Sequence, residues 1–80
     1  MDKKEFGERI LYYLKIKSIN QKDFAKLCDL NETTLSRYIS GEREPKASVI
    51  MKMASILSIT TDELLGMEQY LIKKYISEIN

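Results

Sequence analysis

Histidine is missing from this chain of 80 residues, and cysteine and proline occur once each. Without histidine the chain lacks the most common general base and every Ser–His or Cys–His pair that could activate a nucleophile. A zinc site would depend almost entirely on carboxylates, because Cys28 can supply only one sulfur. We therefore expect no enzymatic activity, no metal and no cofactor.

Glycine and long apolar runs are also scarce. The three glycines, Gly7, Gly41 and Gly66, do not form a phosphate-binding loop. The longest apolar run, residues 10–14, is far too short to cross a bilayer. Charges occur throughout the first turns of the chain, and no small-residue cleavage site follows them. These absences predict a cytoplasmic protein with no membrane association.

An excess of charge of one sign is lacking too, since 13 Lys and Arg face 12 Asp and Glu. The hydrophobic and charged fractions, 44% and 31%, are typical of a globular domain with one small core. Domains that bind DNA by neutralising phosphates are often clearly basic. With a net charge of only +1, the case for DNA binding must come from the arrangement of residues.

Apolar residues recur at helical spacings throughout the chain, and no strict alternation indicates strands. Start and stop signals predict helical segments at residues 2–18, 21–28, 31–40, 46–58, 60–66 and 68–80. The expected capping residues are Asp2, Asn20, Asn31 and Thr60 at N-termini, and Gly41 and Gly66 at C-termini. Pro45 suits the first turn of the fourth segment.

The apolar faces of these segments predict the core. In segment 21–28 the inward residues are Phe24, Ala25, Leu27 and Cys28. In segment 46–58 they are Ile50, Met53, Ala54 and Leu57. Segment 31–40 turns Leu35 and either Tyr38 or Ile39 inward. Cys28 is expected to act as a small buried hydrophobe rather than as a redox sensor.

Segments 21–28 and 31–40 are joined by a turn of about three residues, which is the geometry of a helix-turn-helix. That motif leaves its second helix exposed, so that it can enter the DNA major groove while the first helix crosses the backbone. The outer face of segment 31–40 offers side chains that reach base edges: Glu32, Thr33, Ser36 and Arg37. An ordinary amphipathic surface helix would show the same pattern.

The run from Asn20 to Gly66 closely resembles the phage-repressor/Cro-type (XRE-like) helix-turn-helix family. The matching residues are Gln21, Phe24, Ala25, Leu30, Thr34, Leu35, Ser36, Arg37, Tyr38, Ser40, Gly41, Arg43, Pro45, Met53, Ala54, Leu57, Asp62, Glu63, Leu64, Leu65 and Gly66. The resemblance implies an all-α, lambda-repressor-like five-helix domain at residues 1–66. It also implies sequence-specific binding to double-stranded DNA, usually as a dimer on an inverted repeat.

By position, the resemblance assigns base contacts to Glu32, Thr33 and Arg37, and phosphate contacts to Gln21, Asn31, Tyr38, Ser40, Arg43 and Lys46. Arg37 can donate two hydrogen bonds to guanine O6 and N7. Gln21, at a helix N-terminus, suits a phosphate. Glu32 has two readings: it accepts from cytosine N4, or it only complements the helix dipole.

The chain departs from the family at several positions. Ser18 and Asp29 stand where glycine often adopts positive φ. Many members pair a buried Arg with a Glu where this chain has Leu14 and Ile39, and we predict that these two apolar side chains touch.

Residues 67–80 lie beyond the family's minimal domain. Leu71, Ile72, Tyr75, Ile76 and Ile79 predict a sixth, amphipathic helix for packing or dimerisation. Three arrangements are open for its apolar face. It covers the first segment, where Leu11, Tyr12 and Ile16 are unusually apolar, it contacts a second chain in a homodimer, or it does both as part of a shared interface. The sequence favours a transcriptional repressor. The alternative is an antitoxin or anti-regulator that binds a protein partner through the C-terminal helix, with DNA binding secondary.

Overall fold

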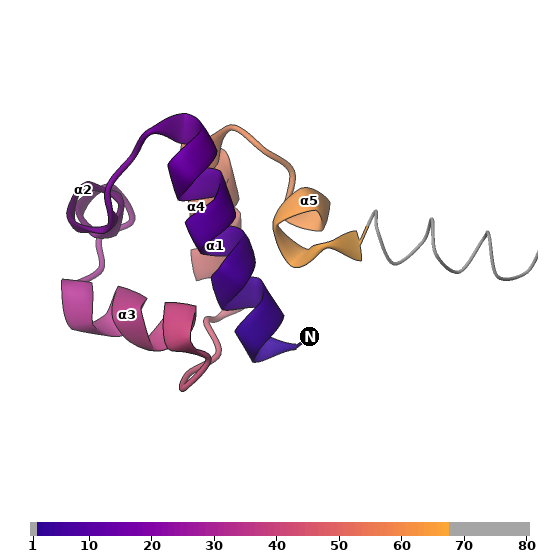
Figure 1. Ribbon diagram of the computed structural model, residues 1–80, viewed down its shortest axis with the longest axis horizontal. Coiled ribbons are helices and arrows are strands. Elements are labelled where there is room, and N and C mark those ends of the chain that lie inside the picture. The colour runs from indigo at the N-terminus through magenta and orange to yellow at the C-terminus, as the bar shows by residue number, and fades with distance from the viewer. Residues whose placement is uncertain (1, 68–80) are drawn as a thin grey trace, which may run out of the picture.

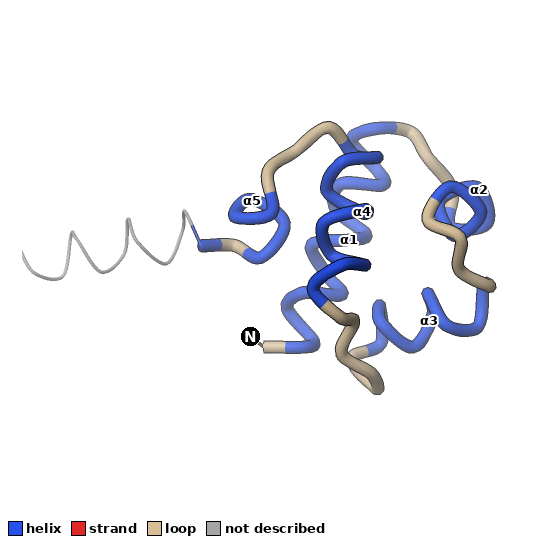
Figure 2. Tube along the Cα trace, turned by 180° about the vertical axis from the view of Figure 1, so that it is seen from behind, coloured by secondary structure: helices blue, strands red, loops and turns tan. Residues whose placement is uncertain are grey.

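The computed structural model describes residues 2–67, which form five α-helices and no strand (Figures 1 and 2). The helices are α1 (Lys3–Lys17), α2 (Gln21–Leu27), α3 (Glu32–Ser40), α4 (Ala47–Leu57) and α5 (Thr61–Leu65). The all-α, five-helix expectation is confirmed. The sixth predicted helix lies outside the described residues. Among the helices described, none has the length and hydrophobicity that a membrane span requires.

Four of the five helices begin at the N-caps that the sequence predicted, Asp2, Asn20, Asn31 and Thr60. At α5 the capping box with Glu63 is complete. The exception is α4, whose N-cap is Lys46 and has no side-chain capping bond. The hydrogen bonds of the first turn of α4 run from the N–H groups of Val49 and Ile50 to the Lys46 carbonyl. The helix therefore begins after Lys46, and Pro45 precedes it instead of occupying its first turn.

Left-handed backbone ends most of these helices. Gly41 and Gly66 have φ of 82° and 77°, as their C-cap positions predicted. Ser18 and Asp29, which stand where the family often has glycine, also have positive φ, at 56° and 57°. The fold therefore keeps the family's backbone at these positions with residues other than glycine, and Asp29 forms the turn between α2 and α3.

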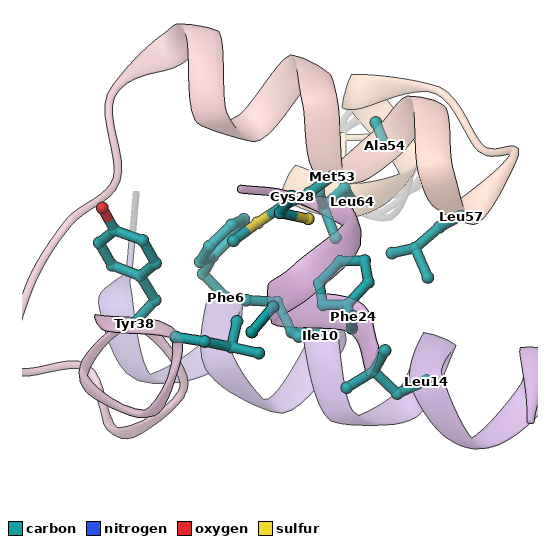
Figure 3. Packing of buried hydrophobic residues seen from close by; sticks show 12 residues of the cluster. Phe6, Ile10, Leu14, Phe24, Cys28, Tyr38, Met53, Ala54, Leu57 and Leu64 are labelled. Atoms are coloured by element: carbon teal, nitrogen blue, oxygen red, sulfur yellow. The ribbon is translucent and has the colours of Figure 1, made fainter. Parts of the chain in front are cut away.

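All five helices contribute to one core (Figure 3). Its buried hydrophobic residues are Phe6, Ile10, Leu14, Phe24, Ala25, Cys28, Leu35, Tyr38, Met53, Ala54, Leu57 and Leu64. Ile50 is only half-buried. The prediction for Leu27 is wrong, because its side chain is 54% exposed. Phe24, Ala25 and Cys28 together cover the inward face of α2, and at roughly 100° per residue Leu27 points well to one side of it.

Helices α1 and α3 approach each other closely at Gly7. A Cβ atom on Gly7 of α1 would lie 1.8 Å from the carbonyl oxygen of Ile39 on α3. The bare glycine thus lets the α3 backbone rest directly on α1, which sets the position of the helix expected to read DNA.

Candidate nucleic-acid interface

The third helix has a buried side and an exposed polar side. Leu35 is 0% and Tyr38 5% exposed, so these two side chains fix the rotation of α3 on the core. The four side chains predicted to reach bases are all exposed: Glu32, Thr33, Ser36 and Arg37. Figure 1 shows α3 at the edge of the molecule opposite α5, with α2 beside its N-terminal end. The structure therefore presents one polar helical surface to the exterior.

The N-termini of α2 and α3 carry Gln21 and Asn31, two of the predicted phosphate contacts. Gln21 is exposed and is the first residue of α2, ahead of the first backbone hydrogen bond, which Phe24 N–H donates to the Asn20 carbonyl. The Asn31 side-chain oxygen accepts from Thr34 N–H at 2.7 Å. The Asn31 side-chain oxygen thus caps the N-terminus of α3. The NH2 group of the same side chain can still donate hydrogen bonds to a phosphate.

The loop after α3 folds back onto the last turn of that helix. The Arg37 carbonyl accepts two hydrogen bonds, from Ser40 Oγ at 3.1 Å and from Arg43 N–H at 3.3 Å. Glu42 N–H in turn donates to Ser40 Oγ at 3.4 Å. The Ser40 hydroxyl proton is thus used within the protein, and a contact with phosphate requires this hydroxyl to rotate. Arg43 and Lys46 are exposed in the same loop.

Tyr38 was predicted both as one of two candidates for the inward face and as a phosphate contact. The structure places its ring in the core, while Ile39 is half-buried. Figure 3 shows the Tyr38 hydroxyl directed away from the other labelled core residues. Of the Tyr38 side chain, the hydroxyl group is therefore the part suited to a contact with DNA.

A salt bridge joins the turn between α2 and α3 to α4. Asp29 Oδ2 lies 2.5 Å from Lys52 Nζ on α4. Hydrogen bonding and charge attraction between the two groups lower the pKa of Asp29 and raise the pKa of Lys52. Sequence reasoning missed this pair, because the two residues are 23 positions apart and no local pattern joins them.

Cys28 lies next to that turn and is buried, as expected for a small hydrophobe. Burial raises the pKa of its thiol to about 11, although the nearby Lys52 charge partly opposes the rise. The thiol is therefore protonated at neutral pH, which disfavours the reactive thiolate that a redox sensor needs.

Comparisons with known proteins agree with this geometry. A helix-turn-helix family model matches residues 10–64. The uncharacterized HTH-type transcriptional regulator YazB of Bacillus subtilis is 34% identical over 64 residues, covering 80% of this chain and 93% of YazB. The restriction-modification controller protein C.AhdI of Aeromonas hydrophila superposes with a TM-score of 0.75 at 28% identity, covering 79% of this chain and 91% of its own. ComR of Streptococcus suis superposes with a TM-score of 0.71 at 29% identity, and the match covers 80% of this chain but only 21% of ComR.

The five-helix fold, with α3 exposed as the second helix of the helix-turn-helix, defines a DNA-binding domain of the kind found in transcription regulators. The chain belongs to the XRE-type helix-turn-helix family.

Proposed function

We propose that this protein is a transcriptional repressor that binds operator DNA by placing α3 in the major groove. The observation that carries the proposal is the exposed polar face of α3 above the inward Leu35 and Tyr38. In this arrangement Arg37 reads a guanine, and Thr33 offers its methyl group to a thymine. Occlusion of a promoter is the simplest consequence of such binding.

Phosphate contacts in this proposal come from both ends of the motif. Gln21 and Asn31 act at the N-termini of α2 and α3, where free N–H groups and the helix dipole attract anions. Ser40, Arg43 and Lys46 act from the C-terminal end of α3 and the loop that follows. Between residues 20 and 46 five basic residues face five acidic ones. General attraction is therefore small, and the specific contacts must carry most of the affinity.

The test is DNA binding by the wild-type protein and by Arg37→Ala, on a duplex selected from a random library. We expect Arg37→Ala to reduce the preference for the guanine by roughly 5- to 150-fold, the value of a bidentate contact. Lys15→Ala, on an exposed position of α1, is the matched loss of a positive charge and should leave the preference unchanged. Binding of the wild type should weaken steeply between two salt concentrations.

Two outcomes contradict the proposal in different ways. If Arg37→Ala binds with the wild-type sequence preference, α3 does not dock through Arg37. If the wild-type protein binds no duplex even at low salt, the protein is not a DNA-binding repressor. The antitoxin or anti-regulator alternative, which the balanced charge of the motif favours, would then replace it.

We further propose that the protein binds an inverted repeat as a homodimer, because one short helix contacts too few base pairs to be selective. Two α3 helices must then lie about 34–36 Å apart, on successive major-groove faces. The apolar residues at 71, 72, 75, 76 and 79 supply the contact between the chains in this proposal.

Sedimentation equilibrium of the full chain tests the dimer. We expect the wild type to be dimeric at micromolar concentration and the double variant Ile72→Ser/Ile76→Ser to be monomeric. The control is Lys73→Ser/Lys74→Ser, which changes the polar residues between them and should remain dimeric. A monomeric wild type contradicts the dimer, and a dimeric Ile72→Ser/Ile76→Ser variant contradicts the role of the C-terminal residues.

A further inference from the structure

A carboxylate lies beside the arginine to which the proposed function gives the central base contact. Glu42 Oε2 is 4.0 Å from Arg37 Nε, and the two side chains are 69% and 54% exposed. Glu42 is on the loop after α3, five positions further along the chain. An exposed ion pair of this kind contributes at most about 1 kcal/mol to stability. Its main consequence is therefore for the orientation of Arg37.

The backbone of the loop holds Glu42 in this place. Gly41 adopts the left-handed conformation that reverses the chain at the end of α3. Ser40 Oγ donates to the Arg37 carbonyl and accepts from Glu42 N–H, so one hydroxyl links the two residues of the ion pair. Arg43 N–H donates to the same carbonyl. The backbone of Glu42 is thus held close to the last turn of the helix that carries Arg37, and its side chain starts from there.

The atom that Glu42 faces matters for base recognition. A guanidinium group has five N–H donors in a rigid plane, and its Nε supplies one of them. Because Glu42 faces Nε, the two terminal Nη groups keep their donors for guanine O6 and N7. At 4.0 Å the carboxylate acts on the guanidinium group by charge attraction rather than by a hydrogen bond. This attraction favours orientations with Nε towards Glu42 and leaves the atoms that read the base unoccupied. The same carboxylate repels nearby phosphates, so it lowers the overall attraction to DNA.

We propose that Glu42 is a specificity-determining positioning residue, which holds the Arg37 guanidinium in the orientation that recognises guanine. The proposal rests on the proposed function, since it requires Arg37 to contact a base. Glu42 itself makes no base contact in this proposal. It reduces the number of orientations that Arg37 can adopt before binding, so less rotational freedom is lost when the two hydrogen bonds to guanine form.

The experiment compares Glu42→Ala with Glu44→Ala, using the duplex selected by the wild-type protein and a duplex in which the guanine read by Arg37 is replaced. Glu44 is exposed in the same loop, so both variants remove one negative charge from the same part of the surface. Any general gain in affinity for DNA should therefore appear in both. We expect Glu42→Ala to lower the preference for guanine by about two- to fivefold, because an exposed ion pair supplies only part of the value of the whole bidentate contact. Glu44→Ala should keep the wild-type preference.

The double variant Arg37→Ala/Glu42→Ala shows whether Glu42 acts through Arg37. We expect it to have the same guanine preference as Arg37→Ala alone, and a further loss would overturn the proposal. The proposal would also be overturned if Glu42→Ala kept the wild-type guanine preference. If that variant in addition bound DNA more tightly than Glu44→Ala, Glu42 would compete with DNA for Arg37 instead of positioning it. Failure of the proposed function gives a different result, because Arg37→Ala would then leave the guanine preference unchanged.

Discussion

Replacing Gly7 by alanine is expected to lower the free energy of unfolding by about 3 kcal/mol, the upper end of the usual effect of overpacking. The added Cβ would lie 1.8 Å from the Ile39 carbonyl oxygen. The Cβ is bonded directly to the α1 backbone and the oxygen belongs to the α3 backbone, so neither atom can rotate away. Alanine alone would favour the helix by roughly 1 kcal/mol over glycine. The steric clash exceeds that gain, so α1 and α3 must separate.

Urea unfolding of Gly7→Ala and Glu8→Ala measures this effect. Glu8 is the next residue of α1 and is exposed, so its replacement by alanine should change stability by less than about 0.5 kcal/mol. The fraction of Gly7→Ala that remains folded should also bind the selected duplex more weakly, because α3 carries the proposed base contacts. Wild-type stability in Gly7→Ala would show that the two helices are not in direct backbone contact.

The parts of the fold that depend on a few neighbouring residues could be predicted from the sequence. Asn20, Asn31 and Thr60 begin their helices because a short side chain accepts a backbone N–H three residues ahead. The exposed face of α3 follows from the spacing of Leu35 and Tyr38 on the opposite side. Asp29 adopts positive φ as its position in the resembled motif indicated. The caps and the exposed face are local features that residue spacing contains, whereas the positive φ of Asp29 was implied by the family resemblance.

The features that sequence reasoning missed depend on contacts between elements. Nothing near Gly7 shows that a carbonyl oxygen from α3 will rest on it. The salt bridge between Asp29 and Lys52 joins the motif turn to α4, and the pair of Arg37 with Glu42 requires the chain to reverse at Gly41. Leu27 was assigned to the core because it is apolar, although its place around α2 leaves it exposed. In the candidate site, the exposure of the side chains on α3 could be predicted from the sequence. The pairing of Arg37 with Glu42 could not.

Replacing Leu14 by arginine is expected to destabilise the domain by about 3–5 kcal/mol, because it places an unpaired charge in the core. Leu14 is 4% exposed, and none of the buried side chains in the described part of the chain is polar or charged. No partner therefore exists there for a guanidinium group. Leu14→Met is the control, because it keeps the volume and the apolar character and should cost less than about 1.5 kcal/mol. Thermal or urea unfolding distinguishes the two.

Adding Ile39→Glu to Leu14→Arg tests whether these two positions are neighbours, as the resemblance to the family predicted. The Ile39 carbonyl rests against Gly7, which is seven residues, or roughly 10 Å, before Leu14 along α1. Arg and Glu side chains are long enough to reach across a gap that Leu and Ile cannot. Recovery of stability in the double variant would therefore show that positions 14 and 39 are near each other, without showing that the native Leu14 and Ile39 side chains touch. We expect the double variant to lose at least about 1 kcal/mol less unfolding free energy than the two single variants lose in sum. Strict additivity of the two losses would place the positions too far apart to interact, and the predicted contact between Leu14 and Ile39 would then be wrong.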